Sequence, residues 1–267
     1  MFDLTKNKKK QATSEQRQAD LRSSRRGFLR MAAGGGIATA AVLAAGCDSN
    51  DPMTDGGNGG GNGGGNGGGG GGGTTTVTLD FSTDTGVLNY AYALEQLEAA
   101  FYAQVVASLD AGDLDLDEVA ANYFRALAVH EDNHRLLFQQ ALGGDAIAGL
   151  TPDFAAASVD FTSAASVLGT AQALEDTGVA AYNGAGQYLT NNDFLTLAGK
   201  IVSVEARHAA AIRAINNTDS ATAFADLSSL TALGANTDFA LDAAASPSAI
   251  AAAASGFIME DLMITGI

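Results

Sequence analysis

Cysteine, long apolar runs and, after residue 46, basic side chains are scarce in this chain of 267 residues. Its single cysteine, Cys47, excludes an intrachain disulfide bond. The apolar run from Met31 to Ala45 is shorter than the roughly 20 residues that a bilayer-spanning helix needs. Residues 1–46 hold nine of the 14 Lys and Arg but only three of the 30 Asp and Glu, so the remainder carries a formal charge of −22. That charge argues against binding to nucleic acid or to anionic lipid head groups.

Residues 1–46 are typical of a signal peptide. Arg25 and Arg26 lie in the stretch Ser-Arg-Arg-Gly-Phe-Leu-Arg, which closely resembles the twin-arginine export signal, and the short apolar run follows it. The alternative interpretation is an ordinary amphipathic helix that contains an Arg pair by chance. The pattern therefore predicts export to the cell envelope or periplasm.

The apolar run ends at Leu-Ala-Ala-Gly-Cys47, which resembles a lipoprotein cleavage site. It departs from the commonest pattern because the leucine lies four residues before the cysteine rather than three. Residues 56–73 contain only Gly and three Asn, a composition that forms a flexible coil. We therefore expect residues 47–73 to tether the protein to a membrane through lipidated Cys47. A plain secreted protein with an incidental cysteine is the alternative.

The remaining residues, 74–267, are expected to form one all-α domain, preceded by a short strand or extended arm at residues 74–81. Apolar residues recur with helical spacing in four segments, at about 85–109, 117–142, 163–189 and 192–216. The first two segments, and the last two, are joined by short turns, whereas about twenty residues (143–162) separate the middle two. This pattern predicts an antiparallel four-helix bundle over residues 85–216 with one long crossover. The extension, residues 217–267, is expected to hold a short helix near residues 248–254.

The first and third helical segments are related by an internal repeat. Residues 87–102 align without gaps with residues 167–182, and eight of the sixteen positions are identical. A duplicated helix pair is what a metal site with approximate two-fold symmetry requires, since each half can supply half of the ligands.

Carboxylate and imidazole side chains recur with helical spacing in the pairs Glu131 with His134 and Glu205 with His208. Positions i and i+3 share one face of a helix, so each pair presents both groups side by side. Two lone glutamates, Glu95 and Glu175, occupy equivalent positions of the repeat. Two such pairs, with one glutamate from each of two other helices, form the ligand set of a di-iron or di-manganese carboxylate site.

Composition supports this interpretation of the six residues. After residue 46 the chain has twenty Asp but only seven Glu, and four of those seven fall at the ligand positions. If these acids only solvated a surface, Asp would dominate here as it does elsewhere. Glu98 is an additional carboxylate near Glu95, or its replacement as a ligand. Tyr102 and Tyr182 are either hydrogen-bond partners of the ligands or simple core aromatics.

At these residues the chain resembles the ferritin-like superfamily, and within it the secreted bacterial proteins with a ferritin-like domain. The resemblance implies two metal ions, with iron favoured over manganese, and ferroxidase, peroxidase or catalase-like chemistry. The chain has no cysteine-ligated electron-transfer domain, so a complete rubrerythrin-type peroxidase is excluded. A homodimer and the identity of an electron partner stay open.

Two other functions compete with a di-metal oxidoreductase. One is a non-enzymatic bundle that protects against stress such as desiccation, with a stabilising or vestigial metal site. The other is a zinc hydrolase, because His130-Glu131-x-x-His134 fits a zinc-protease motif. The zinc interpretation leaves Glu95, Glu175 and the second Glu-x-x-His pair without a role, and it predicts His130 as a ligand. In the di-metal interpretation His130 points away from the site.

Overall fold

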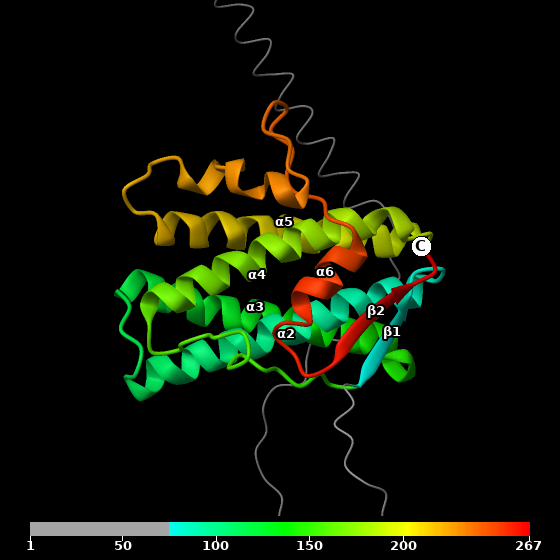
Figure 1. Ribbon diagram of the computed structural model, residues 1–267, viewed down its shortest axis with the longest axis horizontal. Coiled ribbons are helices and arrows are strands. Elements are labelled where there is room, and N and C mark those ends of the chain that lie inside the picture. Colours follow the sequence, from blue (N-terminus) through cyan, green and yellow to red (C-terminus); the bar gives the residue numbers. More distant parts are fainter. Residues whose placement is uncertain (1–74) are drawn as a thin grey trace, which may run out of the picture. The chain divides into compact units, whose positions relative to one another are not determined.

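A computed structural model describes residues 75–267 of the chain (Figure 1). The predicted export signal with Arg25 and Arg26, the lipidation site Cys47 and the Gly-rich tether all lie outside the described residues. Within residues 75–267, no helix combines the length and the hydropathy that crossing a bilayer requires.

Four long helices make up most of the described chain: α2 (Asp84–Ala111), α3 (Glu118–Leu142), α4 (Ala164–Ala185) and α5 (Asn192–Asn216). Each begins after a residue whose side-chain oxygen accepts a hydrogen bond from a backbone N–H of the first turn: Thr83, Asp117, Ser163 and Asn191. Such caps satisfy N–H groups that have no partner inside the helix. The predicted all-α bundle is confirmed, although α4 ends at Ala185 and continues only as a 3₁₀ turn, η2 (Gly186–Tyr188).

The helices pack as two antiparallel pairs, α2 with α3 and α4 with α5 (Figure 1). The segment between α3 and α4 begins with a 3₁₀ turn, η1 (Gly143–Asp145), and then crosses to the second pair. Two amides of α2 hold this crossover in place. Asn89 donates to the carbonyl of Asp145 and accepts from the N–H of Ile147, and Gln96 accepts from the N–H of Leu150. The long middle connection predicted from the sequence is therefore confirmed.

The C-terminal extension packs against the bundle. It contains the 3₁₀ turns η3 (Ala223–Ala225) and η4 (Ser228–Leu233) and the short helix α6 (Pro247–Ala254), which confirms the expected fifth helix. Ala245 donates its N–H to the carbonyl of Ala180 just before α6 begins. This close approach requires Gly184, since a Cβ there would lie 1.8 Å from the Ala245 carbonyl oxygen. The extension can therefore cross α4 only where α4 has no side chain.

Two strands that are far apart in the sequence form a small parallel sheet. The first, β1 (Thr76–Asp80), precedes α2, and the second, β2 (Asp261–Thr265), follows α6. Thr76 pairs with Asp261 and Asp80 with Thr265. The sequence predicted an extended segment at β1 but gave no indication of its partner.

Helices α2 and α4 are the inner helices of the bundle. Large apolar side chains on α2, among them Phe101, Tyr102 and Val105, have no exposed surface. The carboxylates of Glu95 and Glu175 are equally buried at the middle of these two helices. The fold thus places acidic groups in an apolar core, where an unpaired charge costs several kcal/mol.

Candidate metal centre

The six residues predicted as metal ligands converge at the centre of the bundle. Each of the four long helices contributes: α2 supplies Glu95, α3 supplies Glu131 and His134, α4 supplies Glu175, and α5 supplies Glu205 and His208. The four glutamates have no exposed surface, and the exposed fraction of His208 is 3%. The six residues form two overlapping groups of four, and within each group the ligand atoms lie within 4.8 Å of one another.

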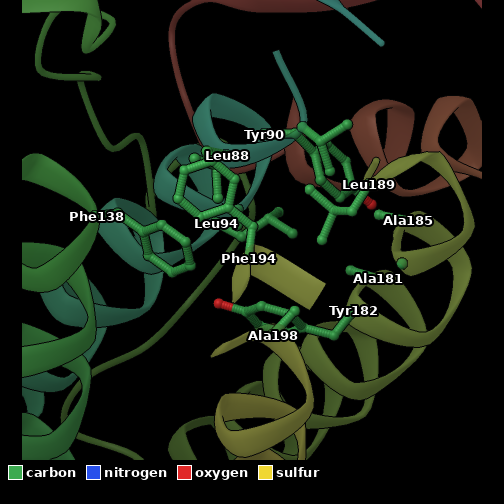
Figure 2. A pocket seen from close by; sticks show the side chains of 13 residues that line it. Leu88, Tyr90, Leu94, Phe138, Ala181, Tyr182, Ala185, Leu189, Phe194 and Ala198 are labelled. Carbon is green, nitrogen blue, oxygen red and sulfur yellow. The ribbon is translucent and has the colours of Figure 1, made fainter. Parts of the chain in front are cut away.

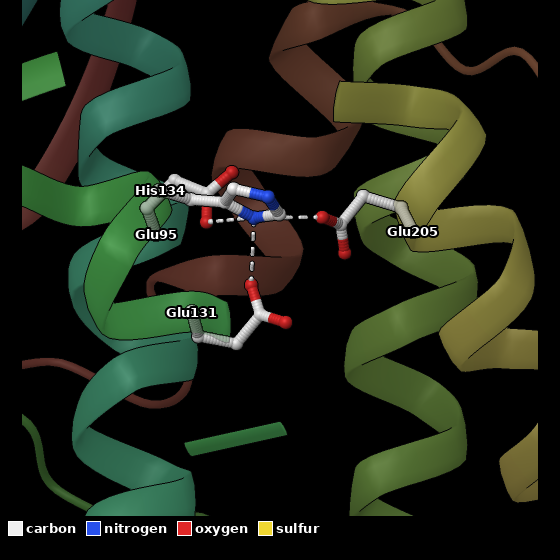
Figure 3. A group of neighbouring side chains, drawn as sticks. All are labelled: Glu95, Glu131, His134 and Glu205. Carbon is white, nitrogen blue, oxygen red and sulfur yellow. Dashed lines mark hydrogen bonds and ion pairs between the residues drawn. The ribbon is translucent and has the colours of Figure 1, made fainter. Parts of the chain in front are cut away.

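The first group consists of Glu95, Glu131, His134 and Glu205 (Figure 3). The imidazole Nδ1 of His134 lies 3.0 Å from Glu205 Oε1, 3.2 Å from Glu131 Oε2 and 3.5 Å from Glu95 Oε2. Three carboxylates from three different helices therefore surround one ring nitrogen.

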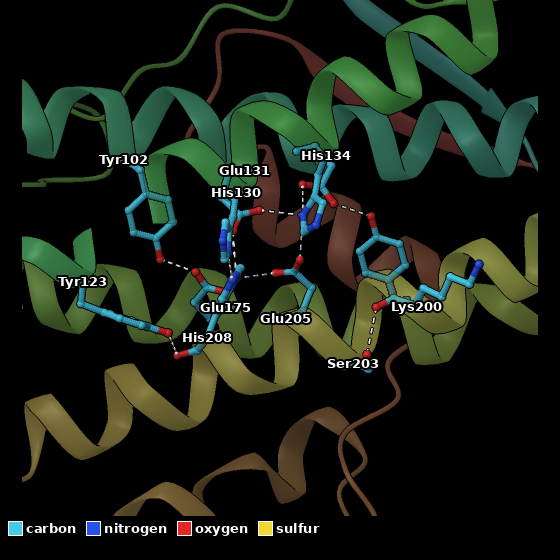
Figure 4. Close-up of polar contacts among 12 residues, drawn as sticks. Tyr102, Tyr123, His130, Glu131, His134, Glu175, Lys200, Ser203, Glu205 and His208 are labelled. Carbon is cyan, nitrogen blue, oxygen red and sulfur yellow. Dashed lines mark hydrogen bonds and ion pairs between the residues drawn. The ribbon is translucent and has the colours of Figure 1, made fainter. Parts of the chain in front are cut away.

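The second group, Glu131, Glu175, Glu205 and His208, repeats this arrangement on the other half of the bundle (Figure 4). Here His208 Nδ1 lies 2.9 Å from Glu131 Oε1, 3.4 Å from Glu175 Oε2 and 3.5 Å from Glu205 Oε2. Each group thus takes three residues from its own half of the repeat and one glutamate from the other half.

Glu131 and Glu205 belong to both groups. Glu131 directs Oε2 toward His134 and Oε1 toward His208, and Glu205 directs Oε1 toward His134 and Oε2 toward His208. A carboxylate that offers one oxygen to each of two neighbouring positions has the geometry of a bridging ligand. Glu95 and Glu175 each belong to a single group and have the geometry of terminal ligands.

Several of these buried atoms have no hydrogen-bond partner within residues 75–267: Glu95 Oε2, Glu131 Oε1, Glu175 Oε2, both oxygens of Glu205 and His208 Nδ1. Some lie close to one another, but the angles are wrong for hydrogen bonds, as between His208 Nδ1 and Glu131 Oε1 at 2.9 Å. Buried polar atoms without partners are costly. Because the unpaired atoms converge in two groups, a cation in each group would satisfy them, and the residues fit such ions.

The two histidines and Glu131 stabilise one another's charged forms. Burial opposes a charge on His134, but the carboxylates of Glu131, Glu205 and Glu95 outweigh it and raise the pKa of His134 to about 12. The same balance raises the pKa of His208 to about 11. Burial likewise opposes a charge on Glu131, yet His134 and His208 lower the pKa of this carboxyl to about 2. Without metal ions, the imidazolium groups would therefore neutralise part of the carboxylate charge.

The two terminal glutamates hold their protons more tightly than usual. Burial, with the neighbouring carboxylates Glu205 and Glu131, raises the pKa of Glu95 to about 8 despite His134. Burial and the same two carboxylates raise the pKa of Glu175 well above its usual range.

Two tyrosines anchor the terminal glutamates across the repeat. Tyr102 on α2 donates its hydroxyl hydrogen bond to Glu175 Oε1 on α4, and Tyr182 on α4 donates to Glu95 Oε1 on α2. Each hydroxyl fixes one carboxylate oxygen and leaves Oε2 directed toward the histidine of its group.

Glu98 is buried near the site but belongs to neither group of four. Burial and the surrounding carboxylates, Glu205 and Glu95 foremost, raise the pKa of Glu98 well above its usual range. Its repeat equivalent is Gly178, where a Cβ would lie 3.1 Å from Glu98 Oε1. The glycine therefore provides space for the Glu98 side chain.

His130 contacts the site, although the sequence predicted that it points away. Its Nδ1 lies 2.9 Å from Nε2 of His208, and the two rings are stacked (Figure 4). The position of His130 directly before Glu131 could have indicated that it lies near the site. Helical spacing alone, however, places His130 off the face that carries Glu131. Neither group of four combines His130 with His134, as a zinc-protease site would require.

A small apolar cavity lies behind Tyr182 (Figure 2). Its volume is about 20 Å³, which is room for about one water molecule, and its walls include Tyr90, Leu94 and Phe138. Tyr182 also donates its hydroxyl hydrogen bond to Glu95, but none of the six ligands lines the cavity.

Comparison with known families identifies a ferritin-like domain. The sequence profile described as ferritin-like domain covers residues 83–218, which is just over half of the chain and spans all four long helices. A search among curated proteins found no similar sequence.

Proposed function

The chain belongs to the ferritin-like domain family, and we propose that it binds two iron or manganese ions between α2, α3, α4 and α5 for redox chemistry. The observation that carries this proposal is the sharing of Glu131 and Glu205 between two groups of ligand atoms. A single ion would need only one of these groups.

The donor atoms favour iron first and manganese second. Carboxylate-rich sites with imidazole and without thiolate suit these metals, whereas zinc sites in proteins commonly use cysteine or several histidines. When bound, a pair of redox-active ions can exchange electrons with O₂ or peroxide. The protein's own groups would hold the ions: Glu131 and Glu205 would bridge them, and Tyr102 and Tyr182 would orient the terminal carboxylates.

Metal stoichiometry tests the bridging arrangement. Glu131→Gln alters both groups, so we expect it to lower bound metal from two ions per chain to less than one. Glu95→Gln alters only the first group, so about one ion should remain. Glu118→Gln, at an exposed position of α3, serves as a control and should keep two. Metal analysis of chains loaded with Mn(II) measures this difference, and equal losses in the first two variants would refute the bridging roles.

Oxidase activity is tested on the same samples. Oxygen consumption after addition of Fe(II) should be rapid in the unaltered chain and slow in Glu131→Gln. One observation speaks for the alternative, a non-enzymatic bundle stabilised by metal: the ligands are almost completely buried. A metal-dependent rise in melting temperature without turnover of oxygen or peroxide would support this alternative.

Export and membrane attachment are further parts of the proposal, and they are supported by the sequence alone. The Arg25–Arg26 pair and Cys47 ahead of the Gly-rich segment support a lipid-anchored protein of the cell envelope. Cell fractionation of a Cys47→Ser variant tests the anchor. Release of the protein in soluble form is expected, and membrane attachment equal to that of the unaltered chain would refute it.

A further inference from the structure

A second and larger cavity lies between α2 and α4 under α6, with a volume of about 170 Å³. Six of its wall residues are repeat equivalents, three from each inner helix: Leu94, Leu97 and Glu98 from α2, and Leu174, Thr177 and Gly178 from α4. The cavity therefore lies where the two halves of the repeat meet.

The cavity exists because the two halves differ at two positions. Leu97 corresponds to the smaller Thr177, and Glu98 corresponds to Gly178, which has no side chain. Had both halves carried Leu and Glu, these side chains would fill much of the space. The difference also leaves the walls apolar except for Glu98 and Thr177.

The carboxyl group of Glu98 forms the polar inner end of the cavity. The exposed fraction of this residue is 3%, so its carboxyl is shielded from bulk solvent. The position of a Cβ on Gly178 lies 3.1 Å from Glu98 Oε1 and 3.9 Å from Oε2 of Glu205. Gly178, which lines the cavity, therefore lies beside both the Glu98 carboxyl and a carboxylate shared by the two groups of ligand atoms.

The outer end of the cavity is accessible to solvent. Ala173 on α4 and Ala253 on α6 are exposed wall residues, and Phe257 beside them is half-buried. A small molecule could thus enter between α4 and α6 and reach Glu98 without unfolding of the bundle.

We propose that this cavity binds a small uncharged molecule that is apolar except for one hydroxyl group, such as a phenol or a short alcohol. A cavity of 150 Å³ with apolar walls accepts benzene, so 170 Å³ accommodates a ligand of about phenol size. A hydroxyl group can both donate and accept a hydrogen bond, and it therefore suits Glu98 whether or not that carboxyl carries a proton. Anionic ligands are disfavoured because the cavity walls include no basic residue.

Binding of this molecule does not depend on metal, but its use as a substrate beside the ions rests on the proposed function. Calorimetric titration of the full chain with phenol tests the binding, both as purified and after removal of metal. We expect saturable binding with a dissociation constant of about 1 mM, the range for so few heavy atoms. Benzene should bind roughly two- to tenfold more weakly because it lacks the hydroxyl, and Glu98→Leu should abolish this preference.

Paired variants on α6 locate the ligand. Ala253→Phe places a ring at the mouth and should abolish phenol binding, whereas Ala252→Phe, at an exposed position outside the cavity wall, should preserve it. Thr177→Leu introduces the residue found at the equivalent position of α2, Leu97, and provides a second way to fill the cavity. Unsaturable heats with the unaltered chain, or equal binding by the two α6 variants, would overturn the proposal. Phenol binding without metal uptake would refute the proposed function alone, and metal uptake without phenol binding would refute the cavity site alone.

Discussion

Metal binding should release protons, because ligands in both groups hold a proton that metal coordination must displace. A ligating nitrogen of histidine must be unprotonated and a ligating carboxyl must be ionised. The carboxylates around His134 and His208 raise the pKa values of these histidines to about 12 and about 11. Burial raises the pKa of Glu95 to about 8 and that of Glu175 well above its usual range.

The number of protons follows from these pKa values. At pH 7 both histidines are protonated, and Glu95 carries about 0.9 of a proton. The first group would release the protons of His134 and Glu95, about two in all, and the second would release that of His208 together with any that the raised pKa of Glu175 retains. We therefore expect about three protons or more per chain. Since each released proton makes affinity rise tenfold per pH unit, the affinity for the ion of the first group should rise about 100-fold per unit near pH 7.

Calorimetry in buffers of different ionisation enthalpy measures the number directly. Metal-free protein is titrated with Mn(II) at pH 7, and the slope of observed enthalpy against buffer enthalpy gives the protons released. Glu118→Gln should leave the number unchanged, whereas Glu175→Gln should lower it by one or more, since the ion of the second group is lost and His208 then keeps its proton. Release of less than one proton per ion would show that the histidines are not protonated as described, and would refute the reasoning.

Three further predictions concern stability and positioning. Metal-free protein should lose up to about 1.4 kcal/mol of stability per pH unit through Glu95 alone as the pH rises from 4.5 to about 8. The reason is that Glu95 keeps a proton in the folded state that it releases in the unfolded state. Thermal melts across pH should show this loss, and a stability that increases with pH would contradict it. Tyr102→Phe should weaken metal binding about 10- to 100-fold, because the Glu175 carboxylate loses the hydrogen bond that orients it. Tyr90→Phe is the control and should leave metal titrations unchanged, since the Tyr90 hydroxyl is buried without a partner within residues 75–267. Asp176→Ala should lower the free energy of unfolding by about 3–5 kcal/mol because it removes the ion-pair partner of the buried Arg213 guanidinium. Denaturant titration should show a smaller loss when Arg213 is also replaced by Met.

Much of the fold was predictable because its local signals agree. Helical spacing of apolar residues, capping residues and two short turns gave the four long helices, and α5 has the predicted bounds, Asn192–Asn216. The pairing of β1 with β2 was not predictable. Five-residue segments carry little pattern of their own, and their pairing depends on where the bundle brings the two ends of the domain.

The residues of the site were also predictable, but their individual roles were not. Residue type and spacing placed the six side chains on inner faces, and the structure brings all six together. The shared positions of Glu131 and Glu205 depend on how the two halves pack against each other, which no local spacing encodes. The contact between His130 and His208 likewise arises only where α3 and α5 approach each other.

Two factors explain why position 98 carries Glu and its repeat equivalent, position 178, carries Gly: the charge of the site and the limited room at position 178. Four ionised glutamates and two divalent ions would carry no net charge, so the proposed centre is balanced without Glu98. A fifth carboxylate is tolerated as the protonated acid, consistent with the raised pKa of Glu98. A sixth, from a glutamate at position 178, would add a side chain where even a Cβ lies 3.1 Å from Glu98 Oε1. The duplicated helices α2 and α4 can therefore share their ligand positions, but they cannot both carry an acid at positions 98 and 178, one turn after the ligands. Gly178 avoids this conflict, and it also opens the cavity beside the site.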